Sequence, residues 1–211
     1  MKLNKKKLLV ILGILYPILT HIAIVQDHFK IALLFLGLVT GIFFLNQLDH
    51  SENFWKNWTA LVPGIGLIVL AIVIVFIDSA RLVLYLPPIF ILVFFLVNFA
   101  KTLLPGREAL ITKISRIVFQ DDTPGIVPYT RQLTWVWTCS LAILLIETVA
   151  LSIFAPIEVW SLFTNILNYV FVLLLFVLEF IYRIHRFGSR YSVLYCLKKL
   201  TQLPINQLFK S

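Results

Sequence analysis

The sequence predicts an all-α, polytopic membrane protein with six transmembrane helices arranged as three hairpins, together with interfacial helices on the cytoplasmic side. Apolar residues make up 60% of the 211 residues and charged residues 13%, whereas globular proteins have roughly 45–50% and about 25%. The apolar residues gather into stretches close to the ~20 residues that a helix needs to cross a bilayer. Lysine and arginine are concentrated in alternate connections between these stretches.

The first apolar stretch follows the basic opening MKLNKKK and has the look of a signal peptide. It is longer than a typical cleavable core, and no A-x-A cleavage signal follows it, so we expect it to remain as the first helix. The next stretch begins after only QDH, which requires a tight helical hairpin. Within one integral membrane domain, the six predicted spans are residues 8–25, 29–46, 58–77, 82–100, 134–154 and 161–182.

The distribution of basic residues predicts that both ends of the chain lie in the cytoplasm. With the N-terminus inside, Lys30 and Arg81 are the only two of the 18 lysines and arginines that fall outside, as the positive-inside rule requires. The cytoplasmic parts then include an amphipathic loop, residues 101–133, and a basic tail, residues 183–211. This asymmetry also explains the net charge of +8, so nucleic acid is not an expected partner.

Two cytoplasmic segments have the pattern of helices that lie on a membrane surface. Residues 107–119 place apolar side chains on one face and polar ones, with a basic excess, on the other, and residues 191–203 repeat the pattern. The apolar face of the first segment would contain Leu110, Ile111, Ile114, Ile117 and Val118, and the polar face Glu108, Thr112, Lys113, Ser115 and Arg116.

Small residues and prolines predict local features of the spans. Gly37 and Gly41 have the spacing that lets two membrane helices pack closely, either within the chain or in a homo-oligomer. Pro87 and Pro88 should distort the fourth span, as should the PGIG run at residues 63–66 in the third. Such a distortion is either a packing kink or a broken helix that builds a substrate site.

No catalytic motif is recognisable in the sequence. It has no glycine-rich phosphate loop, no H-E-x-x-H and no nucleophile elbow, and its four histidines do not cluster. Cys139 and Cys196 lie far apart and are expected to be free thiols. We therefore expect no cofactor and no metal, and we favour a non-enzymatic protein over an enzyme.

Polar groups inside the predicted spans are informative, because they are costly in a bilayer and often functional. Glu147 and Asn168 are expected at the same depth if the last two helices turn near residues 157–158, with Asn165 on the same face as Asn168. Their contact would either hold two helices together or form a substrate or proton site.

A cluster of basic residues forms a second expected site, at the inner membrane face. Such a patch attracts anionic lipid head groups or an acidic protein, although the positive-inside rule alone would also produce it. One of its cations, Arg183, has the helical spacing for an ion pair with Glu179. The residues of this basic cluster are Arg107, Lys113, Arg116, Arg131, Arg183 and Arg186, with Glu108 beside them.

Short motifs in residues 98–187 carry a family resemblance. They are GRE at 106–108, YTR at 129–131, TWVW at 134–137, FAP at 154–156, WSLF at 160–163 and NILNY at 165–169. This part of the chain resembles a family of uncharacterised bacterial inner-membrane proteins, although Ala109 and Val170 stand where the family pattern has proline. Members of that family often accompany gene clusters for aryl-polyene or xanthomonadin-type pigments, alongside acyl carrier proteins and ketosynthases. The resemblance implies an acyl-chain context.

The expected function combines these inferences. We expect a non-enzymatic protein of the bacterial inner membrane that assists the assembly or translocation of an acyl or polyene lipid. An acyl carrier protein or an anionic lipid would bind its basic cytoplasmic face. One alternative is a membrane-embedded acyl- or headgroup-transfer enzyme that uses Arg107 and Glu108, and another is a small proton-coupled transporter that uses Glu147.

Overall fold

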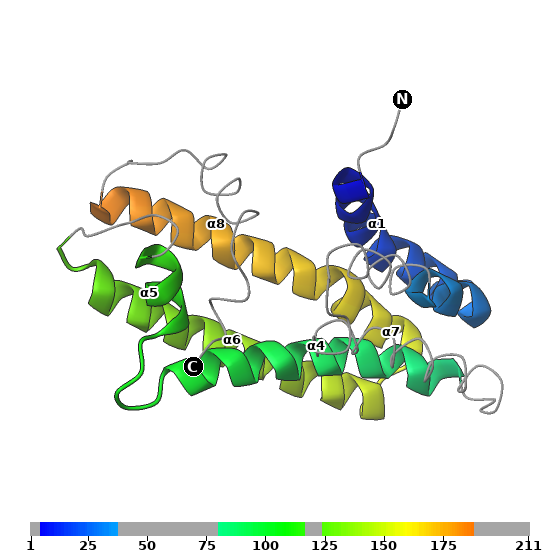
Figure 1. The fold of residues 1–211 in the computed structure, drawn as a ribbon. Helices are drawn as coiled ribbons and strands as arrows, with labels where there is room; N and C mark the ends of the chain where they lie inside the picture. The colour runs from blue at the N-terminus through cyan, green and yellow to red at the C-terminus, as the bar shows by residue number, and fades with distance from the viewer. Residues whose placement is uncertain (1–4, 38–79, 117–123, 188–211) are drawn as a thin grey trace, which may run out of the picture. The chain divides into compact units, whose positions relative to one another are not determined.

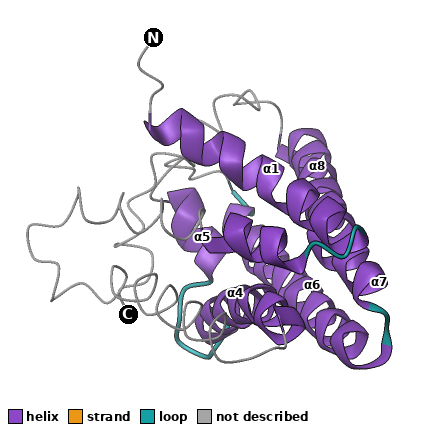
Figure 2. Cartoon of the chain, turned by 90° about the vertical axis from the view of Figure 1, so that its right-hand side faces the viewer, coloured by secondary structure: helices purple, strands orange, loops and turns teal. Residues whose placement is uncertain are grey.

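A computed structural model describes residues 5–37, 80–116 and 124–187, and all regular secondary structure in these ranges is helical (Figure 1 and Figure 2). The all-α prediction is thereby confirmed for this part of the chain. A helix at residues 29–37 follows α1. The labelled elements are α1 (Lys5–Val25), α4 (Ala80–Thr102), α5 (Leu110–Ile114), α6 (Ile126–Phe154), α7 (Ile157–Leu162), the π-helical η3 (Phe163–Leu167) and α8 (Asn168–Phe187).

Three of the described helices are long and apolar enough to cross a membrane. They are Val83–Thr102, Ile126–Phe154 and Ile157–Phe187, the last formed by α7, η3 and α8 in succession. They coincide with the fourth, fifth and sixth predicted spans, and α1 coincides with the first. The third predicted span, half of the second and the tail segment 191–203 lie outside the described residues.

The distribution of side chains around these helices is the reverse of that in a soluble protein. Ile146 and Phe154 of α6 are 69% and 85% exposed, while Thr134 and Thr148 of the same helix are fully buried. Apolar side chains that face outward are stable in lipid, and polar side chains that face inward can find partners there. The chain is therefore a helical membrane protein.

The described helices belong to two compact units. The first contains Met1–Pro88 and Ala150–Tyr169, and the second contains Ile89–Val149 and Val170–Ser211. Each unit is held together by its own contacts.

In the first unit, α1, the helix at 29–37, the start of α4, and α7 share one buried cluster. Asp27, with φ 57°, lies in the short turn after α1, and the His28 amide donates to the Ala23 carbonyl at 2.8 Å. The turn brings two helices together, and Ile24 and Trp160 are the most buried large side chains of the cluster. Its buried members are Ala23, Ile24, Ala32, Leu33, Val83, Leu84, Ile157 and Trp160.

Trp160 is buried although it lies near the end of a span. Tryptophans at such positions favour the membrane interface, as the exposed Trp135 illustrates, but Trp160 is only 1% exposed. Its ring packs edge-on against Tyr85 of α4, with ring centroids 4.6 Å apart. Position along a span predicts the depth of a side chain but not the direction in which it points.

In the second unit, Trp137 joins three helices. Its ring centroid lies 6.4 Å from that of Phe99 on α4 and 4.6 Å from that of Phe176 on α8. Trp137 itself lies on α6 and is buried. Aromatic contacts therefore connect α4, α6 and α8 within this unit.

Several boundaries differ from those predicted. α6 begins at Ile126, well before the predicted start at 134, and α5 begins at Leu110 and not at 107. Thr112 and Ser115, assigned to the polar outer face, are buried. A contact with α6 explains the burial of Thr112, because the Thr130 hydroxyl supplies a partner that a surface helix would find in water.

The turn between the last two spans also lies earlier than predicted. α6 ends at Phe154 and α7 begins at Ile157, so Ala155 and Pro156 form the turn in place of residues 157–158. α4 continues without a break through Pro87 and Pro88, although neither can donate a helical hydrogen bond.

We predict that Ile24→Ala destabilises the protein, whereas Ile22→Ala on the exposed side of α1 does not. Ile24 is fully buried and Ile22 is 46% exposed, so only the first change leaves unfilled space between helices. We expect a loss of about 2 kcal/mol in unfolding free energy for Ile24→Ala, measured by denaturation in detergent micelles. Equal losses for the two variants would contradict the packing of α1 described here.

Candidate functional site

The candidate site is built where α4 ends, at the turn that precedes α5. Gly106 has a φ of 77°, a conformation that glycine adopts without strain. The Arg107 amide donates to the Leu104 carbonyl at 3.1 Å and closes the turn. The chain thereby reverses direction within a few residues and returns to α5, which lies against the first turns of α6 (Figure 1).

Arg131 of α6 holds this turn in place. Its two terminal nitrogens donate to the carbonyls of Leu103 and Arg107, at 3.1 and 3.2 Å. The planar guanidinium suits two such bonds at once, and a helix end such as that of α4 leaves carbonyls that need donors. The sequence analysis assigned Arg131 to the binding surface, but in the structure its side chain is committed to the backbone.

The start of α5 is capped by threonines from the neighbouring helices. The Leu110 amide donates to the Thr102 hydroxyl at 3.0 Å, and the Ile111 amide donates to the Thr134 hydroxyl at 3.3 Å. The residue before the helix is Ala109, whose methyl group cannot supply a cap. A helix of five residues is unstable by itself, so α5 depends on these contacts.

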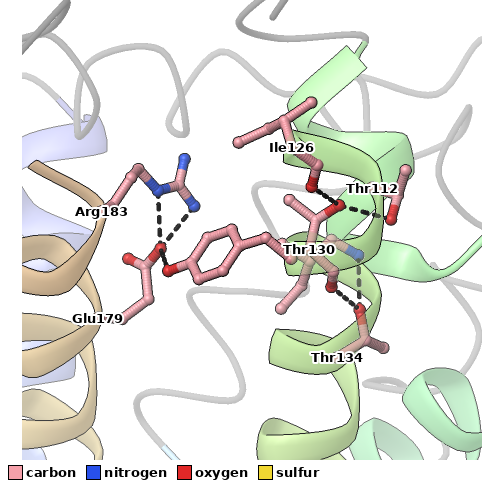
Figure 3. Close-up of polar contacts among 8 residues, drawn as sticks. Thr112, Ile126, Thr130, Thr134, Glu179 and Arg183 are labelled. Carbon is pink, nitrogen blue, oxygen red and sulfur yellow. Dashed lines mark hydrogen bonds and ion pairs between the residues drawn. The ribbon is translucent and has the colours of Figure 1, made fainter. Parts of the chain in front are cut away.

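Thr130 and Thr134 of α6 are four residues apart, and each hydroxyl has a partner on its own helix and another on α5. Thr130 donates to the Ile126 carbonyl at 2.9 Å, and Thr134 donates to the Thr130 carbonyl at 2.8 Å. Their oxygens remain acceptors, so Thr112 of α5 donates to Thr130 across 2.7 Å (Figure 3). Each described hydroxyl in this set is satisfied although it is buried.

A second group of contacts joins α6 to α8. The Glu179 carboxylate accepts from Arg183 at 2.7 and 2.6 Å and from the Tyr129 hydroxyl at 3.2 Å (Figure 3). The Tyr129 ring stacks on Tyr182 and lies 5.1 Å, centroid to centroid, from Phe187. The ion pair of Glu179 with Arg183 is the one predicted from their spacing, and the structure confirms it.

The remaining predicted cations differ in their surroundings. Arg107 is exposed, and Lys113 is partly buried. Arg116 donates to Glu108 at 2.6 Å, with the two side chains 65% and 32% exposed. The Arg186 guanidinium lies 5.9 Å from the centroid of the Phe187 ring.

The predicted intramembrane polar residues fall in different units. Glu147 is partly buried in α6 and belongs to the second unit, whereas Asn165 and Asn168 belong to the first. Asn165 is buried and donates to the Ser161 hydroxyl at 2.9 Å. The pairing of Glu147 with Asn168 stays a prediction. Their equal depth was predicted by counting residues from a turn at 157–158, and the observed turn at Ala155 and Pro156 shifts that count.

Residues that complete the site were missed in the sequence, namely Thr102, Thr112, Tyr129, Thr130 and Thr134. The spacing of Thr130, Thr134 and Thr138 was the available signal, because it aligns three hydroxyls on one helix face. Neither a known protein family, nor a curated protein, nor a solved structure matches the chain. Its function is therefore inferred from this geometry and from the sequence motifs.

We predict that Arg131→Lys loosens the turn at residues 103–109 while the helices stay folded. Lysine keeps the charge but cannot form the two-pronged contact with both carbonyls, which should cost about 1–2 kcal/mol locally. Hydrogen exchange at the amides of Arg107 and Leu110 should become roughly tenfold faster. Arg186→Lys, at an exposed arginine of α8, is the control, and unchanged exchange in Arg131→Lys would contradict the role of Arg131.

Proposed function

We propose that the protein is a non-enzymatic accessory component of the bacterial inner membrane, with six spans and both termini in the cytoplasm. Residues 103–116, named here the anchored segment, would receive an acidic acyl carrier protein. The observation that supports this most is the double contact of Arg131 with the carbonyls of Leu103 and Arg107. It fixes the backbone of a segment whose Arg107 side chain is exposed.

The charges of the anchored segment support an anionic partner. It contains Arg107, Lys113 and Arg116 and a single acidic residue, Glu108. Cations on a fixed backbone attract an acidic surface over distance and orient it on arrival. Because the backbone is already ordered, binding loses less conformational entropy than it would with a flexible loop.

The ion pair between Arg116 and Glu108 supports the same reading. An exposed pair of this kind contributes only about 0–1 kcal/mol, so Arg116 can exchange Glu108 for an acidic partner at little cost. The enzymatic alternative, which uses Arg107 and Glu108, has no further observation in its favour among the described residues. The resemblance to the pigment-cluster family supports the choice of an acyl carrier as the partner and of acyl-lipid assembly or translocation as the task.

Reporter fusions test the proposed topology. Fusions in cytoplasmic connections should be active only as cytoplasmic reporters, and those in periplasmic connections only as periplasmic ones, because basic residues are retained inside. A periplasmic signal from Asp121 would contradict the six-span arrangement. Cytoplasmic signals are expected after Lys7, Asn57, Asp121 and Arg190, and periplasmic signals after His28, Ser79 and Glu158.

Charge reversal tests the docking proposal. Arg107→Glu with Arg116→Glu should reduce capture of an acyl carrier protein by at least about tenfold at low salt, because attraction becomes repulsion. Capture by the unaltered protein should itself weaken steeply as salt rises, since exposed charges are screened over about 8–10 Å. Pull-down with purified carrier at two salt concentrations measures both effects.

The matched control reverses the same number of charges on the opposite side of the membrane. Lys30→Glu with Arg81→Glu changes the net charge equally, and it should leave capture unchanged. Absence of capture by the unaltered protein at low salt would overturn the carrier proposal. Binding of anionic vesicles that is lost only in the Arg107→Glu, Arg116→Glu variant would then identify lipid head groups as the partner of the segment.

A further inference from the structure

A separate polar cluster lies in the first unit, where α7 and η3 meet α1. Four polar side chains of this region are buried, whereas the apolar Val159, Leu162 and Leu167 are 38–40% exposed. This arrangement is expensive inside a membrane span unless the polar groups have a purpose. The polar face consists of Trp160, Ser161, Thr164 and Asn165, which are 1%, 0%, 6% and 7% exposed.

A hydrogen-bond chain connects this face to α1. The Asn165 amide donates to the Ser161 hydroxyl at 2.9 Å, and Ser161 lies 3.0 Å from Nδ1 of His21. Ser161 has one proton, which it can donate to Nδ1 while it accepts from Asn165. His21 then carries its own proton on Nε2, and that nitrogen is a donor.

Two further groups on the polar face have no hydrogen-bond partner among the described residues. They are Nε1 of Trp160, which can only donate, and the hydroxyl of Thr164. Tyr85 packs against the Trp160 ring and fixes it. Most buried polar groups in proteins have a hydrogen-bond partner, so two groups without one on the same face need an explanation. The same residues lie beside and within a π-helical turn, Phe163–Leu167, a feature frequent at functional sites.

We propose that this polar face, together with His21, binds the carbonyl oxygen of an acyl group. The available hydrogen-bonding groups are mainly donors, and the face itself carries no charged side chain, which suits a carbonyl acceptor. Trp160 is three residues from the start of α7 and His21 four residues from the end of α1, hence about 5–6 Å from the helix ends. The face therefore lies near one end of the span, close to the edge of the hydrocarbon core, within reach of the carbonyl of a membrane-bound acyl group.

The acyl group can come from a free fatty acid or from an ester lipid. Its chain would lie along the exposed apolar side chains of the same helices, in contact with the bilayer. This binding is independent of the docking proposed for the anchored segment, because all its residues belong to the first unit. Failure of one proposal therefore leaves the other intact.

Two near-isosteric substitutions test the proposal on the full-length protein in an alkyl maltoside detergent, which has no carbonyl group. Trp160→Phe removes the N–H and keeps an aromatic ring, and Thr164→Val removes the hydroxyl and keeps the branched shape. Without ligand, Thr164→Val should keep or raise the Tm, because it loses an unsatisfied buried hydroxyl, whereas Trp160→Phe also leaves unfilled space between helices and should lower the Tm. Binding of palmitic acid or of a palmitoyl lysophospholipid should weaken at least about fivefold.

The control variant is Thr138→Val, whose hydroxyl donates to the Thr134 carbonyl at 2.7 Å; it should lower the Tm and leave binding unchanged. The control ligand is an ether-linked lysophospholipid, which lacks the carbonyl and should not raise the Tm. Comparison of the acid with the ester identifies the source of the acyl group. The proposal is overturned if neither acyl probe binds, if the ether lipid binds equally well, or if the two variants bind as the unaltered protein does. Loss of stability in ligand-free Thr164→Val would also overturn it, because the hydroxyl would then have a partner.

Discussion

The structure depends on a constraint that the bilayer imposes, namely that every buried polar group must find its partner within the protein. At the start of α6 this constraint is met by threonine hydroxyls that donate to their own helix and accept from α5. The same hydroxyls therefore satisfy the amides of a helix that is too short to form alone. Arg131 has the corresponding role after α4, where its guanidinium donates to the carbonyls of Leu103 and Arg107.

The two polar regions of the molecule differ in how fully this constraint is met. Around the anchored segment, the bonded threonines and Arg131 use their hydrogen-bonding capacity internally, so the docking proposed there would depend on exposed charges. In the first unit, Trp160 and Thr164 retain unused donors beside the bonded Ser161 and Asn165. The first arrangement suits the recognition of a surface, and the second suits the recognition of a single oxygen atom.

The features that the sequence predicted well are those that depend on neighbouring residues. Apolar length located α1, α4, α6 and the last helix, and a four-residue spacing located the ion pair of Glu179 with Arg183. Features that depend on distant partners were missed. The burial of Trp160 requires Tyr85, the early start of α6 accompanies contacts with α5, and the role of Arg131 requires the carbonyl of Leu103. A local sequence pattern does not show which distant residue will be the partner. The threonine spacing in α6 does indicate which face of that helix will contact its partners.

The helix Ile157–Phe187 has 31 residues and is therefore about 45 Å long, whereas the hydrocarbon core is about 30 Å thick. Its apolar part ends at Leu178, about 33 Å from its start, so Glu179 and Arg183 mark the level at which this helix leaves the lipid tails. A thicker bilayer would draw their ion pair toward hydrocarbon, where water competes less for it, and a thinner one would hydrate it. The hydrogen bond of Tyr129 with Glu179 lies at the same level, so bilayer thickness would also affect the contact between α6 and α8.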